Sequence, residues 1–155
     1  MLTDNVQHIG NMSLLEVRKI GFLASRKIAS HSVLPVLDWG FATAKRENVT
    51  VVSGFQSQLE RKVFETLVKG RCGIALVLNR SIYKKVPMEL QPLVDAGRLV
   101  ILSLVPGNVT RGGQYYSEKR NDFIVDISHE LVFASVTEKS SLFKYLATDK
   151  LKIMF

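Results

Sequence analysis

The stretch Ile20-Gly21-Phe22-Leu23-Ala24-Ser25-Arg26-Lys27 decides the fold of this chain, because an apolar run ends there abruptly in a serine and two cations. A second apolar run, Val49-Thr50-Val51-Val52-Ser53-Gly54, ends in small residues about one helix later. Residues 127–142 repeat the pattern. Each is typical of a strand that feeds a turn at the carboxyl edge of an α/β sheet, where such folds bind ligands. These patterns therefore predict where a binding site lies, but they do not yet say what it binds.

Short apolar runs alternate with longer amphipathic segments along the chain. The short runs are rich in Val, Ile, Leu and Phe and predict strands at 20–24, 49–53, 73–78, 99–104, 130–134 and 151–155. The longer segments predict helices at 32–47, between Ser57 and Gly70, and at 87–96, 118–127 and 140–147. This alternation favours parallel strands that are covered on both faces. The expected fold class is α/β, a Rossmann-like three-layer sandwich with a mostly parallel sheet.

Two of these helices carry more detailed expectations. Ser57-Gln58-Leu59-Glu60 forms a capping box, in which the serine accepts from the amide of Glu60 and the glutamate reaches back to the cap. The helix at 32–47 is expected to face inward with a stripe made of Val33, Leu37, Phe41 and Ala44.

The composition bounds the class of protein. The chain has 155 residues, of which 46% are hydrophobic and 23% charged, so one domain is expected over residues 1–155. Residues 1–15 are expected to form an extra helix or an arm. The single cysteine, Cys72, excludes an intramolecular disulfide and indicates a reducing compartment. Because neither a membrane-spanning run nor a signal peptide is recognisable, a cytoplasmic location without a membrane partner is expected.

The net charge of +7 favours polyanionic partners. Small and cationic residues follow several predicted strands, so the fold would gather them at one edge. Free amides, hydroxyls and guanidinium groups are what a phosphate needs, although serines before helices also serve simply as caps. The candidate residues for nucleic-acid or phosphate binding are Ser25, Arg26, Lys27, Ser53, Gly54, Gly107, Arg111, Lys119, Arg120 and Ser140.

The motifs of several enzyme classes are absent from the sequence. It contains no H-E-x-x-H, G-x-S-x-G, G-x-x-x-x-G-K-[ST] or C-x-x-C pattern, and no G-x-G-x-x-G fingerprint. His8, His31 and His129 are scattered and have no metal-ligand spacing. Carboxylates are sparse at the expected edge, so no acid–base pair is predicted. We therefore expect no catalytic residue, no metal and no cofactor.

Four segments together are similar to a known family. Residues 20–27 resemble the strand and "GSR" opening of the DNA-processing protein A (DprA/Smf) Rossmann-like domain, and residues 49–54 resemble its "TVVSG" strand. Residues 119–128 are similar to its "RRNRIIAGLS" helix, and 139–142 to its "SGSL" turn. Ala24, Asp122 and Ser135 depart from the family pattern, as does the segment 55–60. The resemblance, within the broader SLOG/LOG-like superfamily, implies a Rossmann-like fold and single-stranded DNA binding without enzymatic activity.

The combined expectation is a nucleic-acid-binding domain for single-stranded DNA, related to DNA-processing proteins. The alternative is a nucleotide or phosphate-ligand sensor of the SLOG type that uses the same pocket, and a weak nucleotide hydrolase ranks third. The oligomeric state stays open, a homodimer included. Phosphates are expected to bind the cations Arg26, Lys27, Lys119 and Arg120, with shorter contacts from Ser25, Ser53, Gly54 and Ser140.

Overall fold

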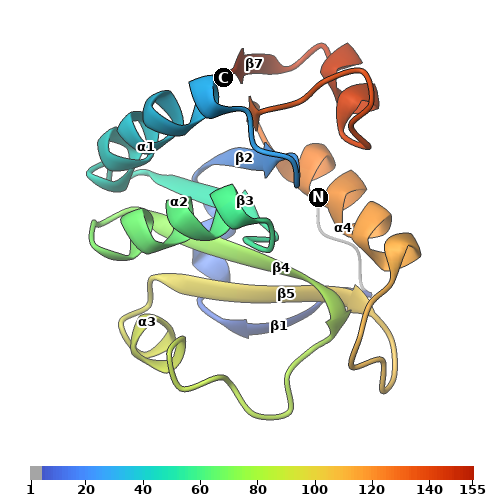
Figure 1. The fold of residues 1–155 in the computed structure, drawn as a ribbon. Helices are drawn as coiled ribbons and strands as arrows, with labels where there is room; N and C mark the ends of the chain where they lie inside the picture. The colour runs from blue at the N-terminus through green and yellow to red at the C-terminus, as the bar shows by residue number, and fades with distance from the viewer. Residues whose placement is uncertain (1–4) are drawn as a thin grey trace.

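A single twisted sheet organises the computed structural model, which describes residues 5–155. Within these residues the strands follow the spatial order β1-β5-β4-β3-β2-β6-β7. All neighbouring strands are parallel except β1, which runs antiparallel to β5 (Figure 1). The strands are β1 (Gln7–Gly10), β2 (Arg18–Ala24), β3 (Val49–Ser53), β4 (Gly73–Ser81), β5 (Leu99–Val105), β6 (Glu130–Ala134) and β7 (Leu151–Met154).

Helices cover both faces of this sheet (Figure 1). One face packs against α1 and α2 with α3 beside them, and the other packs against α4 together with the two short 3-10 helices. The helices are α1 (Ser30–Ala44), α2 (Gln58–Val68), α3 (Gln91–Asp95) and α4 (Gln114–Ile127), with 3-10 turns at η1 (Met12–Glu16) and η2 (Phe143–Ala147). The predicted three-layer α/β sandwich with a mostly parallel sheet is confirmed.

The core consists of two apolar layers because successive strand residues point to opposite faces. In β2, Ile20 and Phe22 are fully buried beneath α1 and α2, whereas Leu23 is buried on the side of α4. The buried strands are almost continuously apolar, as expected for parallel strands covered on both sides. This double cover leaves the strand ends as the places where polar groups of the sheet meet solvent.

The connections of β2 and β6 create a topological switch point. These two strands are neighbours in the sheet, but α1 follows β2 on one face, whereas the segment that contains η2 follows β6 on the other face. Ligands of open α/β sheets bind at such points, outside the carboxyl ends of the strands. The topology therefore directs attention to the loops after β2, β3 and β6.

Several predicted elements differ from the observed ones. The expected inward stripe of α1 is correct only at Ala44, because Phe41 is exposed and the other buried residues are Ser32, Val36, Gly40 and Thr43. Helix α4 begins at Gln114, one turn earlier than predicted, and the helix expected at 140–147 is the short 3-10 turn η2. No helix within residues 5–155 has both the length and the apolarity to cross a bilayer.

The expected N-terminal helix or arm over residues 1–15 contains a strand instead. Residues of β1 pair with β5, and Asn11 then caps η1. Gly10 adopts a φ of +99°, and its backbone lies so close to Leu99 that a side chain would clash there. Residues 1–4 of that expectation lie outside the described part of the chain.

Candidate nucleic-acid interface

Two serines meet at the switch point. Ser25 ends β2 and its amide donates to the carbonyl of Ala134 at the end of β6, 3.1 Å away. Its hydroxyl lies 2.6 Å from the hydroxyl of Ser140, which comes from the segment after β6. Ser140 is half-buried, and its hydroxyl also accepts from the amide of Leu142. The structure thus joins two of the candidate residues that are far apart in the sequence.

The backbone turns sharply beside these serines. Ser135, directly after β6, has a φ of +58°, and Phe55, after β3, has a φ of +46°. Residues other than glycine rarely adopt this left-handed backbone conformation, and those that do cluster at binding sites. The hydroxyl of Ser135 accepts from the amide of Ala29, which ties the loop before α1 to the end of β6. Tertiary contacts therefore hold both turns at the carboxyl edge.

Arg120 lies over the end of β3. Its guanidinium donates to the side-chain oxygen of Gln56, 2.5 Å away, and to that of Asn121, 3.2 Å away. A Cβ atom on Gly54 would come within 2.9 Å of the guanidinium, so glycine is what allows this close approach. Burial lowers the pKa of Arg120, Glu60 raises that pKa, and the charge of Arg26 lowers it further. The charges of Arg26 and Arg120 are therefore close enough to affect each other.

Glu60 is the buried carboxylate of this edge, and the sequence analysis placed it only as a helix cap. It is 5% exposed. One carboxylate oxygen accepts from the amide of Ala24 at 3.0 Å, and the other accepts from the amides of Gln56 and Ser57 at 3.0 and 3.3 Å. The predicted capping box is present, with Ser57 accepting from the amide of Glu60. The same carboxylate thus joins the ends of β2 and β3.

The surface around Ser25, Ser140, Gly54 and Arg120 is called the crevice below. The remaining candidates near it differ in accessibility. Arg26 and Lys27 are exposed in the loop between β2 and α1, and Lys119 is exposed on α4 with its ammonium 5.4 Å from the ring centre of Tyr115. Ser53 is fully buried, and its hydroxyl accepts from the amide of Phe55. Ser53 therefore shapes the loop after β3 and does not face solvent, unlike the expectation of a direct contact.

Two other candidates belong to a second part of the edge. Gly107, with a φ of +68°, and Arg111 lie in the exposed loop between β5 and α4. This loop pairs with the end of β4 through reciprocal hydrogen bonds between Val109 and Ser81. A hollow of about 430 Å³ lies there, lined by Arg80, Ser81, Ile82, Tyr83, Lys84, Lys85, Pro87, Gly107, Asn108 and Thr110. Arg111 and Gly107 are thus grouped with the cations after β4 and not with the crevice.

The segment between β6 and β7 is fastened to α4. Lys144 forms an ion pair with Glu118 at 2.7 Å, and the hydroxyl of Tyr145 donates to Asp122 at 2.5 Å. Burial and the hydrogen bond to Asp122 raise the pKa of Tyr145. These contacts hold Ser140 near Ser25, and the sequence analysis did not anticipate them.

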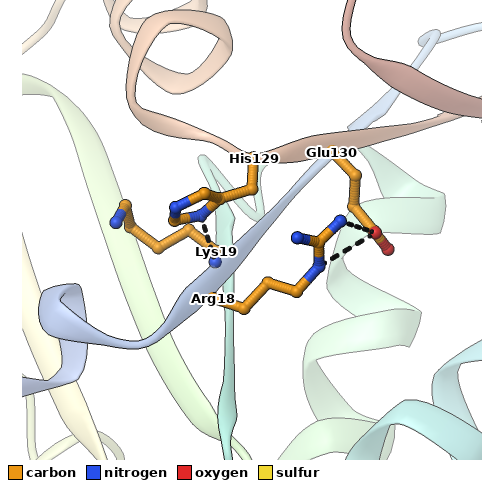
Figure 2. A network of polar contacts seen from close by, with 4 residues as sticks. All are labelled: Arg18, Lys19, His129 and Glu130. Carbon is orange, nitrogen blue, oxygen red and sulfur yellow. Dashed lines mark hydrogen bonds and ion pairs between the residues drawn. The ribbon is translucent and has the colours of Figure 1, made fainter.

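The amino edge of the sheet differs in how its charges are arranged. Figure 2 shows Arg18 of β2 reaching Glu130 of β6 at 2.7 Å, and the amide of Lys19 donating to the ring of His129 at 2.9 Å. A hollow of about 540 Å³ lies beside them, lined by Met12, Leu15, Glu16, Lys19, Asp126, Ile127, Ser128 and His129. Two acids, Glu16 and Asp126, and one lysine, Lys19, line this hollow, so it lacks the positive charge that a polyanion requires.

Metal-binding chemistry finds no support in the described geometry. Among residues 5–155, no three His, Cys, Asp or Glu side chains come close enough together to hold a metal ion. Glu60 uses its oxygens on three amides, and Asp122 accepts from Tyr145. What the carboxyl edge offers is hydroxyls, exposed cations and one half-buried guanidinium, a set suited to phosphate oxygens.

Comparisons with known proteins agree on the fold. No protein-family model and no curated protein matches the chain. Among solved structures, DNA processing protein A from Streptococcus pneumoniae matches with a TM-score of 0.74 and 15% identity over 96% of this chain. A structure of Helicobacter pylori DNA processing protein A, described for its single-stranded DNA binding mode, matches with a TM-score of 0.72 and 15% identity over 96%. The chain spans 54% and 70% of their lengths. Its fold is that of DNA processing protein A.

Proposed function

We propose that this protein binds single-stranded DNA in the crevice at the carboxyl ends of β2, β3 and β6. The observation that carries the proposal is that Arg26, directly after Ser25, and Arg120, over the end of β3, lie at the same edge as the paired hydroxyls of Ser25 and Ser140. One guanidinium is half-buried and fixed, while the other is exposed and able to follow a strand. Phosphate contacts of this kind supply most of the sequence-independent affinity for nucleic acid.

Each group has a role in the proposed complex. Arg120 is the fixed point, because Gln56 and Gly54 hold its guanidinium in place before any ligand arrives. Arg26 and Lys27 contact adjacent backbone phosphates. In the serine pair one hydroxyl donates to the other, and either can be the donor. The accepting hydroxyl keeps its own proton, which it donates to one phosphate oxygen in the proposed complex.

The cations after β4 extend the proposed path. Arg80 stacks over the ring of Tyr83 at 4.8 Å, Lys84 and Lys85 are exposed around the same hollow, and Arg111 is exposed directly after Thr110, which also lines it. A strand held in the crevice can continue toward this group along the same edge of the sheet. Affinity should therefore rise with the length of the oligonucleotide, in contrast to a sensor that is saturated by one nucleotide.

The fold shared with DNA processing protein A makes this ligand class more plausible than the charge does alone. The proposed role is binding without turnover, because the buried carboxylate of Glu60 is engaged by main-chain amides and does not face an open substrate position. A nucleotide sensor would use the same crevice, and titration with ligands of different length distinguishes the two functions.

Fluorescence anisotropy with labelled oligothymidylates of increasing length tests the proposal. Tighter binding with each increase in length, together with weak binding of thymidine 5′-monophosphate, supports a DNA-binding crevice. Saturation by the mononucleotide, with no gain from longer strands, replaces the proposal with the sensor function. A lack of binding to any of these ligands at low salt overturns both.

A further inference from the structure

Glu60 occupies a position that an anionic ligand would otherwise take. Its carboxylate accepts from the amides of Ala24, Gln56 and Ser57, which lie at the end of β2 and at the start of α2. Main-chain amides before a helix are the groups that bind phosphate in many α/β proteins. In this chain an internal carboxylate satisfies them, so an incoming phosphate must rely on the side chains of the crevice.

The carboxylate is also linked to the guanidinium that the crevice presents. Glu60 accepts from the amide of Gln56, and the side chain of Gln56 accepts from Arg120. Glu60 raises the pKa of Arg120, as expected for a nearby negative charge. Glu60 thus places one buried negative charge close to Arg120, which offsets part of the positive charge of the crevice.

We propose that Glu60 sets the ligand selectivity of the crevice, favouring phosphodiesters with one negative charge over phosphate monoesters with two. This inference rests on the proposed DNA-binding function and deepens it. A monoester brings a second negative charge toward Glu60 and must lose more hydration, since the cost of desolvation rises steeply with charge. The crevice would therefore accept a DNA backbone and disfavour free nucleotides.

A matched pair of ligands isolates the effect of charge. Thymidine 5′-monophosphate is a dianion at about pH 8, because its second pKa is about 6, whereas its methyl ester carries one negative charge and the same base. We expect the wild type to bind the methyl ester more tightly. In Glu60→Gln, which has a similar size and keeps one acceptor, affinity should rise about threefold for the ester and about tenfold for the monophosphate, because Coulomb energy scales with ligand charge.

Glu65→Gln is the matched control, since Glu65 lies on the same helix and is exposed. It makes the same change in net charge and should leave the ratio of the two affinities unchanged. If Glu60→Gln does not fold, the comparison of the two ligands on the wild type still decides, because tighter binding of the monophosphate overturns the inference.

The outcomes separate this inference from the proposed function. If the wild type binds oligonucleotides but Glu60→Gln keeps the wild-type ratio, the inference fails and the function stands. If the wild type binds no oligonucleotide but Glu60→Gln gains monophosphate binding, the role of Glu60 stands and the function fails. If neither protein binds any of these ligands, both are overturned.

Discussion

At the amino edge of the sheet, Arg98 and Lys150 point into the protein, whereas at the carboxyl edge Arg26 and Lys27 point into solvent. The guanidinium of Arg98 donates to the carbonyls of Leu67, Val68 and Cys72, around the end of α2. The ammonium of Lys150 donates to carbonyls at the end of α4. Helix carboxyl ends attract cations because their last carbonyls lack partners.

The difference between the edges shows that the net charge of +7 has two physical uses. Arg98 and Lys150 at the amino edge complete hydrogen bonds of the fold, so they are not available to a partner. Side chains of Arg26 and Lys27 make no hydrogen bond or ion pair with another residue in the described range 5–155. Only the second kind of cation can release counterions from nucleic acid, which is the basis of the proposed function.

The largest effect should come from removing Arg98. Arg98→Ala should lower the free energy of unfolding by about 2–4 kcal/mol, because buried and half-buried carbonyls lose a charged donor. Urea unfolding measures this change. Arg71→Ala is the control at the same edge, since its ion pair with Glu47 is exposed and should contribute at most about 1 kcal/mol. Equal stability of the two variants would show that the amino-edge cations are not structural.

Removing Arg120 tests the other side of the comparison. Arg120→Ala should weaken binding to single-stranded DNA by about tenfold, because a charge-assisted contact to phosphate is lost at a fixed position. Anisotropy titration measures the affinity, and circular dichroism checks that the variant is folded. Unchanged affinity in a folded variant would remove Arg120 from the proposed site.

Gly54→Ala separates the position of Arg120 from its charge. The new Cβ would lie 2.9 Å from the guanidinium and displace it, while every charge is kept. Since the displaced group is the end of a long side chain, stability should change by less than about 1 kcal/mol. DNA affinity should fall severalfold in the same titration. Gly113→Ala at the start of α4, with no atom within 4 Å of its added Cβ, should bind as the wild type does.

A smaller effect concerns the dependence of stability on pH. Partial desolvation lowers the pKa of His129, and the charges of Lys19, Arg18 and Lys150 lower it further, against the effect of Glu130. The unfolded chain therefore takes up a proton on His129 more readily, so the stabilising effect of the neutral ring is present above its ordinary pKa of 6.5 and is lost as pH falls through the lower folded pKa.

Urea unfolding of the wild type and of His129→Asn, at pH values on both sides of that range, measures this contribution. The wild type should lose more stability on acidification than the variant. An identical loss in both proteins would contradict a role for the ring that accepts from the amide of Lys19.

The strands and the location of the crevice could be predicted from sequence because they depend on local patterns. The bounds predicted for β3 and β6 agree with the structure, and the end of β2 was placed at Ala24. Parallel strands bring their carboxyl ends to one edge, so the pattern also predicted the edge at which Ser25 and Ser140 lie, but not their hydrogen bond to each other.

The orientation of α1 could not be predicted in the same way. Its inward side contains Ser32, whose hydroxyl donates to the carbonyl of Phe155, and Gly40, which packs against α2, while apolar Leu34 and Phe41 face outward. Hydrophobic periodicity alone selects the wrong side, because close packing between helices favours small residues here. Tertiary contacts override the pattern.

The role of Glu60 was equally hidden in the sequence. The capping box located its bond to the start of α2, but its bond to the amide of Ala24 joins residues 36 positions apart. The structural role of Arg98 is hidden for a related reason, since its three carbonyl-bearing partners precede it by 26 to 31 positions. Long-range partners of this kind give no local signal.

The most direct test of the central claim is the salt dependence of single-stranded DNA binding for two single-cation variants. Arg26→Ala and Arg46→Ala each remove one exposed arginine, the first after β2 at the carboxyl edge and the second before β3 at the amino edge. Arg26→Ala should weaken binding for all sequences alike and flatten the log–log slope by about 0.7. Arg46→Ala should leave affinity and slope unchanged. Equal losses in both variants, or a loss in Arg46→Ala alone, would contradict the account.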